Sequence, residues 1–185
     1  DINIKYVAII LLILMFPIYN IYNSILINSS YTALVTILVI IIAFIFSCVA
    51  AYMAGIVGSS NNPVSGLTIA TILLSALFIK YLGFVSNAGM VSSILFGSII
   101  CCSSAIAGDN MQDLKTGHLI NATPWKQQIM QIIGVVASAL TITITLNILH
   151  SAYGIGSEIL PAPQANLMKV VVEGVFNMNL PWNWI

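Results

Sequence analysis

The segment GSSNNPVSG (residues 58–66) places hydroxyl and amide side chains between two long apolar runs. Such side chains can bind a polar ligand, and they can also cap the free N–H groups of a helix. An amide followed by Pro is typical of a helix start. We therefore predict that Asn62 lies at or next to the N-terminus of a helix beginning near Pro63, and that its amide caps this helix. The candidate ligand-binding residues are Ser59, Ser60, Asn61, Asn62 and Ser65.

A second polar segment, GDNMQDLKTGHLINATPWKQQ (residues 108–128), carries three charged side chains close together. One interpretation is a capped connector, in which Asp109 or Asn110 starts a short helix that Gly117 ends. The other is a charge set that changes partners, or carries protons, between two states of a membrane protein. The sequence leaves both open. The candidates for gating or proton coupling are Asp109, Asp113 and Lys115.

Neither a metal site nor a catalytic centre is expected. Cys48, Cys101 and Cys102 lie in apolar runs without the C-x-x-C spacing of a metal site, so they are interpreted as small buried apolar side chains. An intramembrane hydrolase needs a Ser in a Gly-containing turn, but Pro63 stands where the first Gly would be in the turn around Ser65. We expect no catalytic residue and no cofactor, and hence no enzyme.

The composition requires a lipid environment. Hydrophobic residues make up 59% of the 185 residues and charged residues only 5%, with a formal net charge of zero. A soluble domain carries about a quarter charged residues, so this chain is predicted to be an integral membrane protein with the bilayer as its partner. The sequence contains no Arg and no basic stripe, which excludes a nucleic-acid partner.

Hydrophobic runs near the 20 residues of a bilayer-spanning helix divide the chain. The fold class is an all-α polytopic membrane protein of about five passes, with residues 1–185 as one membrane-embedded segment and no soluble domain. Trp182 and Trp184 are expected at the interface. The predicted passes are residues 6–22, 32–57, 67–82, 90–107 and 129–149.

The interruption at residues 58–66 has two interpretations. Ser and Asn are usual in an ordinary turn outside the membrane. Alternatively, the chain forms a broken or re-entrant helix, whose N-terminus directs free N–H groups and a positive dipole end at a ligand.

The lysines suggest an orientation, because positive residues accumulate in cytoplasmic loops. If the passes alternate, Lys5, Lys115 and Lys126 share one side and Lys80 lies near the other. The first side is predicted to be cytoplasmic, with the protein in a cell inner membrane or plasma membrane.

Three stretches together resemble the oligopeptide transporter superfamily, most closely its bacterial branch, which is related to the yellow-stripe metal-chelate carriers. Residues 105–136 follow an aGDxMQDLKTGxLxGATPxxQQ-like pattern of that family. Asn121 departs from it where Gly is common, and Trp125-Lys126 stands where a basic pair is common. The other two stretches are AGIVGSSNNPVSGLTIATILL (residues 54–74) and LPAPQANLMKVVVEGVF (residues 160–176), which is followed by LPW.

The resemblance implies a helical carrier built of two related halves, which moves short peptides or metal chelates together with protons. This chain would be a segment of the second half, with the remainder of its own transporter chain as partner, and its start at Asp1 rather than Met fits that expectation. Residues 58–66 would then line the substrate path. A channel or a non-catalytic membrane subunit is the alternative, and an intramembrane hydrolase is disfavoured.

Overall fold

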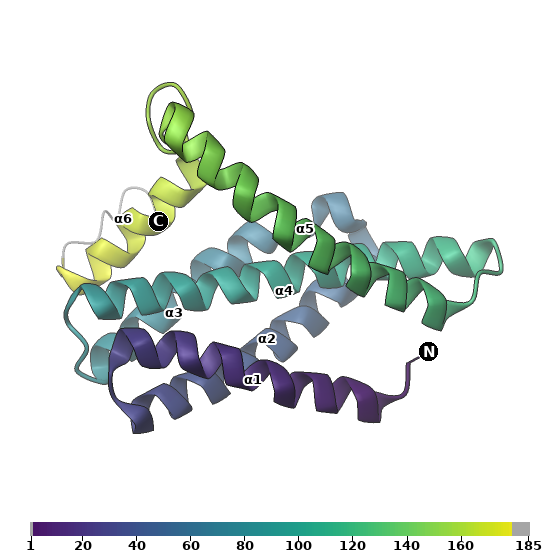
Figure 1. Cartoon of the computed structure of the whole chain (residues 1–185), viewed down its shortest axis with the longest axis horizontal. Helices are drawn as coiled ribbons and strands as arrows, with labels where there is room; N and C mark the ends of the chain where they lie inside the picture. The colour runs from purple at the N-terminus through teal and green to yellow at the C-terminus, as the bar shows by residue number, and fades with distance from the viewer. Residues whose placement is uncertain (1, 179–185) are drawn as a thin grey trace.

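The computed structural model describes residues 2–178, and these fold into helices joined by short connections, without a strand (Figure 1). This confirms the all-α fold class. The predicted interfacial residues Trp182 and Trp184, and the LPW motif, lie outside the described residues. The elements are α1 (Ile4–Leu26), α2 (Ser29–Val57), the 3-10 turn η1 (Ser59–Asn61), α3 (Val64–Tyr81), α4 (Asn87–Leu119), α5 (Pro124–Tyr153) and α6 (Pro163–Phe176).

Five of these helices, α1 to α5, are long and apolar enough to cross a membrane. Their positions match the five predicted passes, and the protein is a multi-pass membrane protein. The chain reverses direction between α2 and α3 and again between α3 and α4 (Figure 1). The described helix α6, with 14 residues, is shorter than a span.

Helix α4 is the centre of the bundle, because every other described helix packs against it. Its glycines allow close approach, as expected for small residues at a membrane helix interface. A Cβ at Gly89 would collide with Phe176 of α6, and one at Gly97 would collide with Ile72 of α3. One side of residues 90–107 packs inside the protein, since Ser92, Ser93, Phe96, Gly97, Ile100 and Ser104 are buried.

Two apolar clusters hold the bundle together around α4. One joins α3, α4 and α6 through residues such as Ile79 and Val172. The other joins α1, α2 and α4, with Tyr22 and Ile100 fully buried within it.

The short capped helix predicted near Asp109 does not form. Helix α4 continues without interruption through Asp109, Asn110 and Gly117 and ends only at Leu119. The good helix formers Met, Gln, Leu and Lys of this stretch let the helix propagate, so the side chains of Asp109 and Asn110 have no free helix start to cap. The chain then turns at Asn121, whose φ is +57°.

The lysines segregate to opposite ends as predicted. The backbone N–H of Ile2 donates to Oε1 of Gln128 (2.9 Å), so the start of α1 lies beside the start of α5. Lys5 is thus at the same end as Lys115 and Lys126, whereas Lys80 lies at the far end of α3 (Figure 1). Which end faces the cytoplasm stays a prediction.

Candidate functional site

The interruption between α2 and α3 is a compact turn. Helix α2 ends at Val57, and Gly58 (φ +85°) supplies a backbone conformation that residues with a Cβ rarely adopt. The turn η1 follows, and α3 begins at Val64. The prediction that Asn62 adjoins a helix start is confirmed.

The predicted cap, however, is wrong. Pro63 occupies the N-cap position of α3, and no side chain caps it. Asn61 instead donates from Nδ2 to the backbone O of Val57 (3.3 Å), at the end of α2. Asn62 has the extended backbone that a following Pro favours, and both polar atoms of its amide are buried without a hydrogen-bond partner in the described part of the chain.

The turn packs directly on α4, within the second polar segment. A Cβ at Gly108 would lie 2.5 Å from Nδ2 of Asn62, so the absence of a side chain at Gly108 makes room for the amide. One helical turn further on, the hydroxyl of Ser59 donates to Oε1 of Gln112. The two polar segments of the sequence therefore meet at one place in the fold.

The end of α4 is joined to the start of α5 through Asp113. Its carboxylate accepts a hydrogen bond from Nε2 of Gln131 (3.1 Å), and its backbone O accepts one from Nε2 of Gln127 (3.3 Å). Gln127 also packs against Gly117, where a Cβ would collide with its amide. This junction lies on the same helix as the contact with the turn, and Asp113 directly follows Gln112 in the sequence.

Most of the remaining candidate residues are exposed. Asp109, Lys115, Ser60 and Ser65 are exposed. The ion pair that the structure gives for residues 2–178 is Lys169–Glu173 (3.7 Å), so Asp109, Asp113 and Lys115 do not pair with one another. The structure brings together Ser59, Asn62 and Asp113 along α4 and leaves the others at the surface.

Sequence reasoning missed four partners in this region. Gln112, Gln127 and Gln131 provide the side-chain hydrogen bonds, and Gly108 provides the space for Asn62. The spacing of Gln127 and Gln131, four residues apart on one helix face, was a usable signal for a shared contact.

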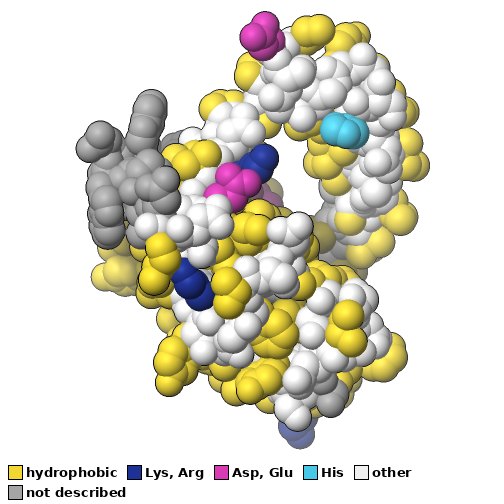
Figure 2. Space-filling model, turned by 90° about the vertical axis from the view of Figure 1, so that its left-hand side faces the viewer, with side chains coloured by type: hydrophobic (Ala, Val, Ile, Leu, Met, Phe, Trp, Pro, Cys, Tyr) yellow, Lys and Arg dark blue, Asp and Glu magenta, His cyan; other side chains and the backbone are white. Residues whose placement is uncertain are grey.

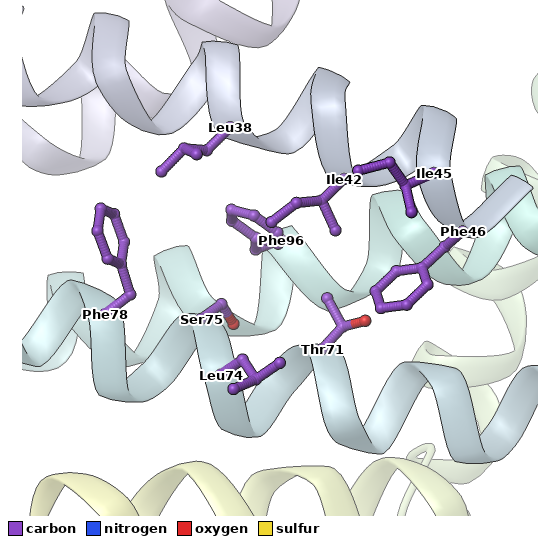
Figure 3. A pocket seen from close by; sticks show the side chains of 9 residues that line it. All are labelled: Leu38, Ile42, Ile45, Phe46, Thr71, Leu74, Ser75, Phe78 and Phe96. Atoms are coloured by element: carbon purple, nitrogen blue, oxygen red, sulfur yellow. The ribbon is translucent and has the colours of Figure 1, made fainter.

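A cavity of about 340 Å³ lies among α2, α3 and α4 but lacks the chemistry of a polar site (Figure 3). Its two hydroxyl groups are already hydrogen-bonded. Thr71 donates to the backbone O of Leu67 (2.6 Å), and Ser75 donates to backbone O atoms of Ile72 (3.0 Å) and Ser93 (3.3 Å). The other lining residues are Leu38, Ile42, Ile45, Phe46, Leu74, Phe78 and Phe96.

No cluster of three or more His, Cys, Asp or Glu side chains able to hold a metal ion occurs among residues 2–178. The three cysteines of this part are free thiols, with Cys48 and Cys102 exposed and Cys101 partly exposed. The expectation that these side chains are buried is therefore wrong, because an apolar run in a membrane helix also supplies its exposed faces.

Comparison with known proteins identifies the family. The family described as OPT oligopeptide transporter protein matches residues 3–185. No solved structure gives a significant match.

Three relatives illustrate the range of that family. A Haemophilus influenzae protein named as an oligopeptide transporter is 37% identical over 171 residues, which cover 81% of this chain and 27% of the relative. The metal-nicotianamine transporter YSL3 of Arabidopsis thaliana is 32% identical over 123 residues (61% of this chain, 17% of the relative). The iron-phytosiderophore transporter yellow stripe 1 of Zea mays is 26% identical over 140 residues (70% and 20%). The chain thus spans about a quarter or less of the length of these relatives.

Proposed function

Because this chain belongs to the OPT oligopeptide transporter family, we propose that it is a membrane-embedded segment of a secondary active transporter for peptides or metal chelates. The segment belongs to the second half of the carrier and works together with the remainder of its own transporter chain. Transport is coupled to protons and takes place in a cell inner membrane or plasma membrane. No catalytic step and no cofactor are part of this proposal.

One observation indicates which residues take part: the turn at residues 58–63 packs on α4 at Gly108 and Gln112. The turn and the facing part of α4 both carry polar side chains. Irregular backbone at membrane depth is tolerated where it is packed in protein or lines a cavity. We assign the substrate path to this junction, with Ser59, Asn61 and Asn62 at its wall.

Asn62 is the residue at the centre of the assignment. A buried amide without a partner costs about 1–3 kcal/mol, so a rearrangement that gives it a partner is favoured. A carboxylate of a peptide or chelate is one such partner, since the amide NH₂ supplies two donors. Ser60 and Ser65, which are exposed on either side, extend the polar surface toward solvent.

The test is uptake by the full-length carrier with Asn62→Ala, using a radiolabelled tripeptide and a metal–nicotianamine complex as probes. We expect transport per molecule to fall about tenfold or more, mainly through weaker apparent affinity, while membrane abundance changes little. Asn62→Asp should also fail, because its charge repels a substrate carboxylate.

Asn147→Ala, on an exposed face of α5, is the matched control and should transport normally. If Asn62→Asp transports normally, Asn62 does not bind a carboxylate, and the assignment is wrong. Downhill flux of substrate without any dependence on a proton gradient would favour the channel alternative over the carrier.

A further inference from the structure

Helix α6 is a half-helix docked on the side of the bundle. Its 14 residues extend about 21 Å, against the roughly 30 Å of a bilayer core. One face is buried: Val172 is fully covered, and Phe176 packs over Gly89 of α4. The opposite face carries the Lys169–Glu173 pair.

The C-terminus of α6 ends on a charged side chain from α3. The ammonium group of Lys80 donates to the backbone O of Val175 (2.7 Å) and to that of Phe176 (3.1 Å). These carbonyls belong to the last turn of the helix, where the helix dipole favours a positive charge, and that of Val175 also accepts a long hydrogen bond from the backbone N–H of Met178 (3.4 Å). Lys80 is partly buried, whereas the other four lysines are exposed.

The Lys80 hydrogen bonds contribute more to the docking of α6 in a membrane than they would in water. Lipid tails are as apolar as the valines of α6, so burying those valines provides little driving force for docking. A charge-assisted hydrogen bond in a low-dielectric setting retains its strength. The polar contact therefore contributes a large share of what holds α6 in place.

The other end of α6 is loosely connected. The link from α5 contains Gly154 (φ +68°) and Gly156 (φ +93°), and among the described helices α5 packs mainly against α4. The space-filling view shows an opening between the arch of α5 and α6 and the rest of the molecule (Figure 2). A helix that follows a glycine-containing link, packs through one apolar face and is fixed at its C-terminus by one charged side chain can move as a unit once that charged contact breaks.

We propose that Lys80 is a positioning residue that latches α6 to α3: its ammonium group binds the C-terminal carbonyls of α6, and breaking that contact frees α6 to move away from the bundle. The latch depends on positive charge at the tip of Lys80. It does not depend on which substrate the carrier moves, so it can be tested independently of the proposed substrate path.

The experiment is hydrogen exchange measured by mass spectrometry on the full-length protein in lipid nanodiscs. In Lys80→Met, which keeps the length of the side chain but removes its charge, we expect the amides of α6 to exchange about tenfold faster or more. Lys80→Arg should keep the amides of α6 protected from exchange, because the guanidinium also donates to carbonyl oxygens. Lys169→Met, an exposed lysine on α6 itself, is the matched control and should leave exchange unchanged.

Unchanged exchange of α6 in Lys80→Met would overturn the proposal. So would faster exchange of α2 to the same extent, because Lys80 would then stabilise the whole bundle rather than latch one helix. Should Lys80→Met not accumulate in membranes, Lys80→Gln, which is neutral, takes its place with the same expectations.

Discussion

At the scale of single residues, polar groups without a matching partner mark the region of interest. Asn62 buries both polar atoms of its amide against α4 without a hydrogen bond in the described structure. Most buried side-chain polar atoms in proteins are paired, so this amide calls for an explanation, such as a bound water, a bound ligand or a change of packing. Ser59 and Gln112, by contrast, pair with each other and fix the turn to α4.

Asp113 permits a test that separates charge from hydrogen bonding. Its carboxylate accepts from Gln131 of α5, and Asn at this position can still accept through its side-chain oxygen but cannot carry a proton. If Asp113 couples transport to protons, Asp113→Asn should lose uphill, proton-driven uptake by about tenfold or more while still exchanging substrate across the membrane. Uptake and exchange assays in proteoliposomes measure both.

Glu158→Gln, in the exposed link after α5, is the control and should retain uphill uptake. A different outcome is that Asp113→Asn accumulates substrate normally under a proton gradient while Asp113→Ala does not. Asp113 would then join α4 to α5 by hydrogen bonds and have no part in proton coupling.

At the scale of elements, α4 organises the molecule through its glycines. Gly89, Gly97, Gly108 and Gly117 each receive a side chain from a different element: α6, α3, the turn after η1, and α5. Because each glycine removes a Cβ at a crossing, the helix can pack closely with all four neighbours in the absence of a hydrophobic driving force. The turn proposed to line the substrate path is thus positioned by the same glycine contacts that build the bundle.

The crossing of α3 and α4 gives a prediction about stability. Gly97→Ala places a Cβ against the buried, branched side chain of Ile72, and the overpacking should destabilise the full-length protein by about 1–3 kcal/mol. In the Ile72→Ala background the same change should cost little, because the colliding atoms are gone. Thermal unfolding of the purified variants in detergent measures both effects.

The double variant is the internal control, because it adds the same Cβ at position 97 and removes the side chain that this Cβ would meet. An equal loss for Gly97→Ala in both backgrounds would show that the crossing with Ile72 is not the cause.

At the scale of the whole molecule, α1, α2 and α5 leave most of their surface uncovered by other described helices. None of the most apolar window of α5 or α1 is buried, and in α2 only 22% is. Small polar residues such as Ser138 and Thr141 on α5 also lie exposed. Faces with such residues are typical of helix–helix interfaces rather than of lipid-facing surfaces.

We therefore expect residues 1–185, produced alone, to aggregate or to form a heterogeneous oligomer in detergent. The full-length carrier, in which other helices cover these faces, should be homogeneous under the same conditions. Size-exclusion chromatography with light scattering compares the two. A monodisperse monomer of residues 1–185 with a cooperative unfolding transition would contradict the expectation that other helices cover these faces.

Local features of the sequence determined much of this protein. Runs of apolar residues predicted five membrane-crossing helices, because a helix in lipid needs a minimum length that can be counted. The turn formers and Pro63 predicted the interruption and the helix start next to Asn62. The spacing of the passes predicted that Lys5, Lys115 and Lys126 share one end. Each of these properties depends on residues adjacent in the chain.

The tertiary structure alone decided which groups meet. Asn62 faces Gly108 instead of capping α3, and α4 continues past Asp109 where a new helix start was expected. Lys80 finds its acceptors in a helix that lies far along the chain, at Val175 and Phe176. Any suitable partner that the fold brings near can hydrogen-bond to a free helix end or fill the space left by a missing Cβ. That choice depends on how the helices cross, which the local pattern of residue types does not specify.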